Sequence, residues 1–300
     1  MRLILGPLLF HWPPDKMRDF YARIADEADL DGVVIGEAVC SKRLPLIAEA
    51  LAEAAARLER AGKEVILASP ILIAGPREEA LAAALAKESR LIEAEDVAML
   101  AFLQGRPHRI GPFVNVYNGA TARHLLDRGA VRITLPPELP GAALSHIAAA
   151  VGGEALEVLA FGRLPLAISA RCIEARLAGR RKDDCRFACA GAPDGRAVHT
   201  LEGAPFLAIN GVQTLSFAYL NLITEVPALR AAGIGGLRLS PQDCDMVEVA
   251  ALFRAVIEDR MDPAEGLARL EALLPERVFA NGHFHGRAGA AFIAPSPGQA

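Results

Sequence analysis

Short apolar runs alternate with amphipathic stretches along almost the whole chain. Runs rich in valine, isoleucine and leucine predict strands at residues 3–10, 32–36, 65–73, 91–92, 112–116, 131–135, 156–161, 206–209 and 236–239. Apolar residues at helical spacing predict helices at residues 15–27, 46–60, 77–87, 93–103, 121–127, 142–151, 213–223, 226–232, 247–258 and 263–273. Strands that alternate with helices in this way indicate a parallel sheet.

The pattern contains about eight such strand–helix units, and no change in composition marks a linker between them. Eight units favour an α/β fold of the (β/α)8 TIM-barrel type, in which some irregularity is tolerated. The alternative is an open, doubly wound sheet, which is weakened because no G-x-G-x-x-G motif follows any strand. We expect one barrel-like domain over residues 1–300, with a cysteine-bearing loop at 169–195 and an irregular tail from about residue 280.

Composition and charge exclude several classes of protein. Of the 300 residues, 52% are hydrophobic and 23% are charged, which excludes an intrinsically disordered chain. A net charge of −4 and an aromatic content of 5% argue against nucleic-acid binding. The most apolar stretch, residues 65–76, contains Pro70 and Gly75 and is too short to span a bilayer. The apolar N-terminal run has no small-residue cleavage site after it, so we expect a cytoplasmic protein without a transmembrane segment.

The cysteines are the first sign of specific chemistry. Their number is five, and an odd count without a secretion signal argues against a disulfide framework. Cys172, Cys185 and Cys189 follow the spacing C-x12-C-x3-C, and charged residues 180–184 together with Gly191 and Pro193 mark their segment as a polar loop. Thiols beside basic residues on such a loop readily become thiolates that bind metals.

The spacing also narrows the choice of metal. Soft thiolates select zinc, copper(I) or iron–sulfur clusters, but the paired C-x2-C knuckles of structural zinc sites are missing from this sequence. A 4Fe–4S cluster needs four cysteines, whose spacing can be irregular, so one distant cysteine has to join the three in the loop. Cys40 and Cys244 each follow a predicted strand, where a barrel has its active face. Position alone leaves both as candidates.

Several motifs together resemble a known family. They are Leu-Gly-Pro at residues 5–7, Trp-Pro at 12–13, Gly-Glu-Ala-Val-Cys-Ser-Lys-Arg at 36–43, Ser-Ala-Arg-Cys at 169–172, Asn-Gly-Val-Gln-Thr at 210–214 and Arg-Leu-Ser-Pro-Gln at 238–242. With them, the chain resembles the UbiV family of ubiquinone-biosynthesis accessory proteins, which is related to the collagenase-like (U32-type) peptidases. The resemblance extends from about residue 3 to about residue 290.

The resemblance implies a cofactor, an activity and partners. It places the ligands of a 4Fe–4S cluster on Cys40, Cys172, Cys185 and Cys189, and leaves Cys244 outside the family pattern. It implies that the chain works as a heterodimer with a UbiU-like protein in the oxygen-independent hydroxylation of ubiquinone precursors. The implied oxygen donor is a compound other than O2, such as prephenate. A UbiT-like lipid-binding protein is expected to hold the quinone precursor.

Further residues are candidates for substrate chemistry. Glu37 is a candidate proton donor or the polar end of a strand, and Arg171 is a candidate for binding a carboxylate donor in a bidentate manner. Asn115, Tyr117 and Asn118 present amides and a phenol to a ligand, or else form a turn with Asx hydrogen bonds. Two other functions stay open, a collagenase-like peptidase and a non-catalytic redox or scaffold subunit. The sequence does not separate a catalytic from an accessory role for this chain.

Overall fold

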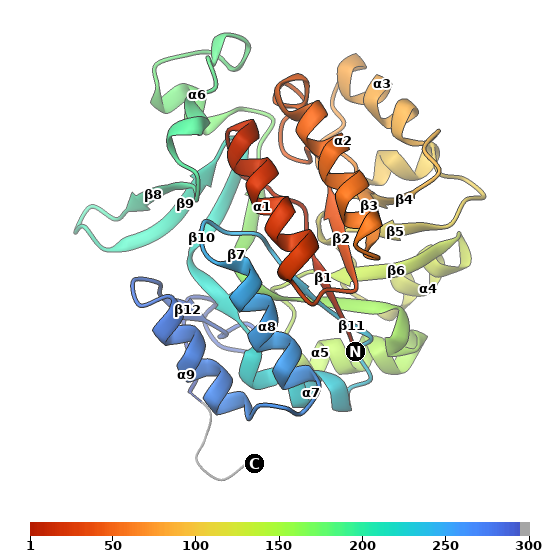
Figure 1. Cartoon of the computed structure of the whole chain (residues 1–300), viewed down its shortest axis with the longest axis vertical. Coiled ribbons are helices and arrows are strands. Elements are labelled where there is room, and N and C mark those ends of the chain that lie inside the picture. The colour runs from red at the N-terminus through yellow and green to blue at the C-terminus, as the bar shows by residue number, and fades with distance from the viewer. Residues whose placement is uncertain (295–300) are drawn as a thin grey trace.

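The computed structural model describes residues 1–294, and its centre is a closed barrel of parallel strands (Figure 1). Within those residues eight strands form the barrel: β1 (Arg2–Leu5), β2 (Gly32–Ile35), β3 (Glu64–Ala68), β4 (Leu91–Ala94), β5 (His108–Ile110), β6 (Ala130–Leu135), β7 (Leu156–Ile168) and β11 (Gly236–Leu239). Strand β11 pairs in parallel with both β1 and β7, which closes the barrel. The fold is therefore an α/β barrel of the TIM type, and the open doubly wound alternative is wrong.

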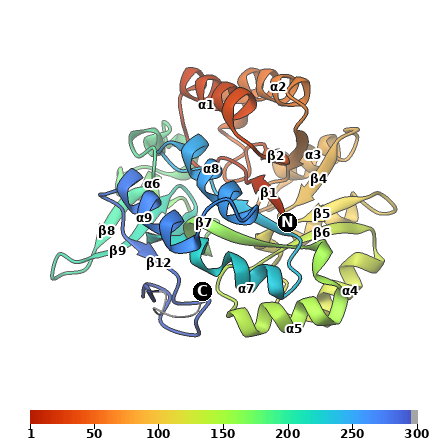
Figure 2. The same cartoon turned by 60° about the horizontal axis from the view of Figure 1, so that its bottom comes forward.

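Helices cover the outside of the strands and appear as a ring in Figure 2. They are α1 (Pro14–Glu27), α2 (Leu44–Arg60), α3 (Pro76–Leu85), α4 (Gly119–Asp127), α5 (Gly141–Val151), α7 (Val226–Ala231), α8 (Met246–Ile257) and α9 (Pro263–Leu273). Their ends follow ordinary capping chemistry. Asp245, for example, accepts hydrogen bonds from two backbone amides in the first turn of α8, and proline stands in the first turn of α1, α2 and α3. None of the helices in residues 1–294 is long and apolar enough to cross a membrane.

An antiparallel extension grows out of one barrel strand. Strand β7 continues beyond the barrel and pairs with β10 (Gln213–Asn221), which pairs with β9 (Pro205–Asn210), which pairs with β8 (Arg196–His199). The β8–β9 hairpin stands out from the barrel in both views (Figure 1, Figure 2). Between β7 and β8 the chain forms the short helix α6 (Ile173–Leu177) and the cysteine loop. The extension therefore places this loop at the carboxyl end of the barrel strands.

The structure corrects three predicted elements. Residues 213–223 form strand β10 instead of a helix, because pairing with β7 on one side and β9 on the other outweighs local periodicity. Residues 112–116 are not a strand, since Pro112 begins a 3-10 turn and the strand lies earlier, at β5. Of the helix predicted at 93–103, the first two residues belong to β4 and only Val97–Ala101 forms a helical turn.

The predicted irregular tail is seen in part. Strand β12 (Phe279–Ala280) pairs with β10, and turns without regular structure follow it to residue 294. Residues 295–300 of the predicted tail lie outside the described residues.

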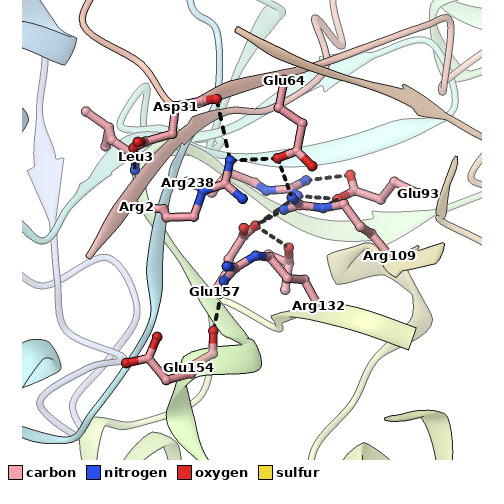
Figure 3. A network of polar contacts seen from close by, with 11 residues as sticks. Arg2, Leu3, Asp31, Glu64, Glu93, Arg109, Arg132, Glu154, Glu157 and Arg238 are labelled. Carbon is pink, nitrogen blue, oxygen red and sulfur yellow. Dashed lines mark hydrogen bonds and ion pairs between the residues drawn. The ribbon is translucent and has the colours of Figure 1, made fainter. Parts of the chain in front are cut away.

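A network of ion pairs fills the interior of the barrel (Figure 3). Glu93 on β4, Arg109 on β5, Glu157 on β7 and Arg238 on β11 are each at most 2% exposed. Arg238 donates one hydrogen bond of 2.7 Å to Glu93 and lies 3.4 Å from Glu157, while Arg109 pairs with both carboxylates. Two guanidinium groups thus balance two carboxylates, so the network is electrically neutral.

A third buried carboxyl, that of Glu95, adjoins this network at the end of β4. Burial, followed by repulsion from Glu93, raises the pKa of Glu95 well above its ordinary value. A Cβ atom on Gly111 would lie 1.8 Å from a Glu95 carboxyl oxygen, so any larger residue there would displace the Glu95 side chain. Glu93 shows the opposite behaviour, since the arginines hold its pKa down to about 2 although burial alone would raise it.

Candidate metal site

Four cysteines that lie far apart in the sequence line one pocket beyond the carboxyl ends of the barrel strands. They are Cys40, Cys172, Cys185 and Cys189. Cys40 follows β2, Cys172 follows β7, and the other two lie in the loop between α6 and β8. All four are free thiols of intermediate exposure. The tertiary structure thus unites the three loop cysteines with one of the two distant candidates.

Hydrogen bonds hold the first two of these cysteines in place. The carboxylate of Glu37 accepts hydrogen bonds from the backbone N–H groups of Val39 (3.0 Å) and Cys40 (2.9 Å), which shapes the turn after β2. Cys172 is the N-cap of α6, and its Sγ accepts a hydrogen bond of 3.4 Å from the N–H of Ala175. Glu37 is buried, so in this structure it positions the Cys40 turn.

A strained turn presents Cys185 and Cys189 to the same pocket. Arg186 and Phe187 have φ angles of 47° and 54°, in the left-handed region that side chains other than glycine seldom adopt. Each such residue costs on the order of 1–3 kcal/mol, and such strain often occurs at functional sites. The Phe187 ring lies 5.6 Å from the ring of His11, measured between centroids, and forms part of the pocket wall. Burial, and then Arg43, lower the pKa of His11 to about 4.

Contacts at both ends fasten the cysteine loop to the barrel. The Lys42 ammonium donates to the carbonyl of Lys182 (2.6 Å) and pairs with Asp183 (3.0 Å), which joins the Cys40 turn to the start of the loop. At the far end, the indole N–H of Trp12 donates to the carbonyl of Pro193 (2.7 Å). Asp194 is bound there by Arg163 at 2.9 Å. The relative positions of the four thiols therefore depend on the barrel itself.

The tight turn between β9 and β10 forms the floor of the pocket. Gly211 has a φ of +63°, and a Cβ atom there would lie 3.0 Å from the guanidinium of Arg43, so both backbone and space favour glycine. The carbonyl of Gly211 accepts a hydrogen bond of 2.9 Å from the N–H of Ile173, the residue after Cys172. Asn210 donates to the carbonyl of Leu9 (2.8 Å). This turn thus connects the segment after β1, helix α6 and the cysteines.

The electrostatic environment acts on the thiols in two directions. Burial raises the pKa of Cys40 and that of Cys189, while the Arg43 guanidinium lowers both by a smaller amount. Metal binding at these thiols accordingly releases protons. Among the described residues, no three cysteine, histidine or acidic side chains converge on one point at the distances of a single metal ion. The four thiols instead line one small pocket.

The fifth cysteine lies elsewhere. Cys244 follows β11, does not line the cysteine pocket, and packs against the hydrophobic core with its sulfur 3.6 Å from the sulfur of Met246. Burial, aided by the charge of Asp194, raises its pKa to about 12. The structure therefore separates Cys244 from the other four.

The remaining predicted residues do not meet at this pocket. Asn115, Tyr117 and Asn118 lie in the turn before α4, where Asn118 caps the helix by accepting a hydrogen bond of 2.8 Å from Thr121 and the Tyr117 hydroxyl donates to Glu138. This capping is the Asx turn of the alternative interpretation, and a substrate-binding role stays a prediction. Arg171 is exposed beside Cys172.

Two buried charged residues of the pocket were not singled out from the sequence. Arg43, the last residue of the motif at 36–43, is 1% exposed and lines the pocket. Glu174 is equally buried there and pairs with Arg196 of β8 at 3.0 Å. Charged residues in amphipathic or polar segments normally face water, so only their tertiary position shows that they are buried.

The fold and the site define a class of protein, an α/β barrel with a four-thiol pocket at the carboxyl ends of its strands. Residues 14–292 match the sequence profile described as Peptidase family U32, and the chain belongs to this family. The family membership rests on this sequence match.

Three solved structures are distantly similar to this chain. The U32 peptidase Mk0906 is 15% identical with a TM-score of 0.44, over 81% of this chain and 93% of that one. Dihydropteroate synthase from Thermus thermophilus, in complex with 6HMPPP, is 16% identical with a TM-score of 0.40, over 91% and 94%. N-acetylneuraminate lyase from Aliivibrio salmonicida is 9% identical with a TM-score of 0.45, over 94% and 84%.

Proposed function

We propose that Cys40, Cys172, Cys185 and Cys189 hold one 4Fe–4S cluster. The observation that carries this proposal is that four free thiols from three distant segments line one pocket. Four cysteine thiolates are the usual ligands of such a cluster. Each thiolate binds a different iron, so the ligands surround a volume and need not converge on one point. The donor set and its arrangement therefore fit this group.

The chain is proposed to act as a UbiV-type, cluster-binding subunit in the oxygen-independent hydroxylation of ubiquinone precursors in the cytoplasm. Membership of the U32 family supports the broader relationship. More specific support comes from the motifs of the resemblance, because three of them build the pocket: residues 36–43 supply Cys40 and Arg43, residues 169–172 supply Cys172, and residues 210–214 supply its floor.

The resemblance implies the proposed partner, and electron counting supports it. A bound 4Fe–4S cluster would transfer one electron at a time, whereas hydroxylation of a ring carbon removes two electrons from the substrate. A UbiU-like protein with a second redox centre balances this count as the other subunit of a heterodimer. The projecting β8–β9 hairpin also exposes Leu201 and Phe206, two apolar side chains that a partner can cover.

The residues of this chain have separate roles in the proposal. Glu37 holds the backbone of Cys40, while Phe187 and Val212 provide apolar walls that limit water. Arg171, exposed beside Cys172, is suited to bind the carboxylate of an oxygen donor such as prephenate. The quinone precursor is proposed to arrive on a UbiT-like lipid-binding protein.

Iron analysis of anaerobically purified protein tests the cluster. We expect about four irons and four sulfides per chain, and the electron paramagnetic resonance signal of a reduced 4Fe–4S cluster. Each single Cys→Ala variant at the four positions loses most of the iron, whereas the matched control Cys244→Ser retains it. A full cluster in Cys40→Ala together with iron loss in Cys244→Ser would show that the ligand assignment is wrong.

Co-expression with a UbiU-like protein tests the role. We expect a one-to-one complex in anaerobic size-exclusion chromatography, and loss of anaerobic ubiquinone synthesis in cells that carry Cys185→Ala but not in cells that carry Cys244→Ser. A cluster-loaded monomer that restores synthesis without the partner would contradict the heterodimer. Normal synthesis with an iron-free variant would favour a scaffold role.

Peptidase activity is a second candidate, because the family is named for it. Incubation of the purified protein with denatured collagen distinguishes the two functions. Cleavage that persists in Cys185→Ala would favour the peptidase and would oppose the hydroxylation proposal.

A further inference from the structure

One buried cation faces the four thiols. Arg43 is 1% exposed and lies three residues after Cys40, at the back of the pocket. Its guanidinium donates hydrogen bonds to the carbonyl of Leu9 (3.0 Å) and to the side-chain oxygen of Asn210 (3.1 Å). These two contacts come from the segment after β1 and from β9, so they fix the plane of the guanidinium relative to the barrel.

The donors of Arg43 are not all used. A guanidinium has five N–H groups, and the Nε–H of Arg43 has no hydrogen-bond partner among the described residues although it is fully buried. A buried donor without a partner costs about 1–3 kcal/mol, so such a group calls for an explanation. The Nε–H groups of Arg109 and Arg238 in the barrel interior also have no partner, but of the three arginines Arg43 is the one whose side chain lines the cysteine pocket and acts on Cys189 by its charge.

The charge of Arg43 is only partly compensated. The nearest carboxylate is that of Glu37, whose oxygen lies 3.8 Å from the guanidinium and whose hydrogen bonds go to the backbone of Val39 and Cys40. The pair is buried, so water screens its field only weakly. The Arg43 guanidinium therefore strongly attracts any negative charge that develops among the four thiolates, and the Glu37 carboxylate strongly repels it.

We propose that Arg43 is a positioning residue that donates a hydrogen bond from Nε–H to the cluster or its thiolates and raises the reduction potential of the cluster, with Glu37 acting in the opposite direction. The inference rests on the proposed function. With four thiolates, a 4Fe–4S cluster carries a net charge of about −2 when oxidised and about −3 after it takes one electron. A buried cation stabilises the more negative state, and a buried anion destabilises it.

A redox titration tests this role without any activity assay. The whole chain, purified with its cluster under anaerobic conditions, is titrated with dithionite as the one-electron donor, and the reduced cluster is followed by electron paramagnetic resonance. Arg43→Met is expected to shift the ratio of reduced to oxidised cluster by about tenfold or more toward the oxidised form, which is about 59 mV for one electron. Glu37→Gln, which retains an oxygen acceptor for the Cys40 amide, is expected to shift it the other way.

The matched control is Arg176→Met, which removes an exposed cation four residues from Cys172. Solvent and salt screen this charge, so a shift below about threefold is expected. Arg43→Lys keeps the charge but not the planar donors, and an intermediate shift is expected. If Arg43→Met does not fold, as judged by circular dichroism, Arg43→Lys and Glu37→Gln still show in which direction each charge shifts the reduction potential.

Different results would contradict the proposed function and the proposed role of Arg43. If the wild-type chain binds no iron, the proposed function fails. If the cluster is present but its potential in the Arg43 variants equals that of Arg176→Met, or if Glu37→Gln shifts the potential in the same direction as Arg43→Met, only this inference is wrong.

Discussion

The barrel interior and the cysteine pocket both bury reactive or charged groups, but they differ in how closely opposite charges are paired. In the interior, Glu93 and Glu157 are paired with Arg109 and Arg238 within the chain itself (Figure 3). In the pocket, four thiols from three segments line one cavity, two of them flank a strained turn, and the Arg43 guanidinium lies 3.8 Å from its nearest carboxylate.

This difference separates a structural from a ligand-binding use of buried polarity. A network whose opposite charges are paired within the chain stabilises one arrangement of strands and needs no further ion to balance it. A pocket lined by four soft ligands gains most when another group binds there. We therefore expect changes in the interior to affect folding, and changes in the pocket to affect ligand binding.

The largest effect is expected from breaking the interior network. Arg238→Met leaves Glu93 with one arginine fewer at the centre of the barrel, and removal of one partner from a buried pair costs about 3–5 kcal/mol. Urea denaturation under argon measures this loss. Arg269→Met breaks an exposed pair with Glu265 and is the control, with an expected cost below about 1 kcal/mol. Equal costs in the two variants would show that the interior network has no special role.

The next largest effect is expected on the pH dependence of the free energy of unfolding. Because the folded-state pKa of Glu95 is raised, the folded chain holds one proton more than the unfolded chain above the ordinary pKa of glutamate. The contribution of Glu95 to stability therefore falls as pH rises, by about 1.4 kcal/mol per pH unit, until Glu95 itself ionises. Glu95→Gln is expected to remove this contribution, so the difference in unfolding free energy between wild type and variant should change by this slope in urea unfolding from about pH 5 upward in unit steps.

Glu93 provides the internal contrast for that experiment. Its lowered pKa contributes stability that is present above the ordinary value and is lost as pH falls through the folded-state value. Glu95→Gln should leave this acid-side loss in place, and Glu79→Gln on the exposed face of α3 is the control for removal of one carboxylate. An unchanged slope in Glu95→Gln would contradict a protonated Glu95.

A smaller effect is expected where the two regions meet. Trp12→Phe keeps an aromatic ring against Phe20 but removes the N–H that binds the carbonyl of Pro193. The loss of one such hydrogen bond costs about 1 kcal/mol and loosens the end of the cysteine loop. Limited proteolysis should then cut residues 180–193 faster than in the wild type. Unchanged cleavage would mean that Arg163 and Asp194 anchor the loop without the indole.

The smallest effect on folding is expected inside the pocket. Cys185 is only partly buried, so Cys185→Ser in iron-free protein should change the free energy of unfolding by no more than about 0.5 kcal/mol. The same variant is expected to lose most of its iron. A large loss of stability in the iron-free variant would show that the thiol has a packing role, and the contrast between the two regions would then be weaker.

Much of the barrel was predictable from the sequence. The predicted helices at 15–27, 46–60 and 247–258 agree with α1, α2 and α8 to within a few residues. Helices α1 and α2 bury one face, which the spacing of their apolar residues records, and α8 is a long apolar run that is buried almost all round. Strand β10 was not predictable in this way. Its conformation depends on ladders with β7 and β9, which are contacts that local periodicity does not contain.

The cysteine site, like the barrel, was predictable only in its local features. The sequence by itself determined that Cys172, Cys185 and Cys189 share a polar loop, because their spacing and flanking charges are local properties. Only the tertiary structure decided that Cys40 joins them while Cys244 packs against the core, since barrel closure sets which strand ends face the loop. Only the tertiary structure likewise shows that Arg43 is buried at the pocket, because its guanidinium is bound by the segment after β1 and by β9, which are distant in the sequence. Burial and charge pairing are properties of the assembled barrel, and a sequence read along its length does not contain them.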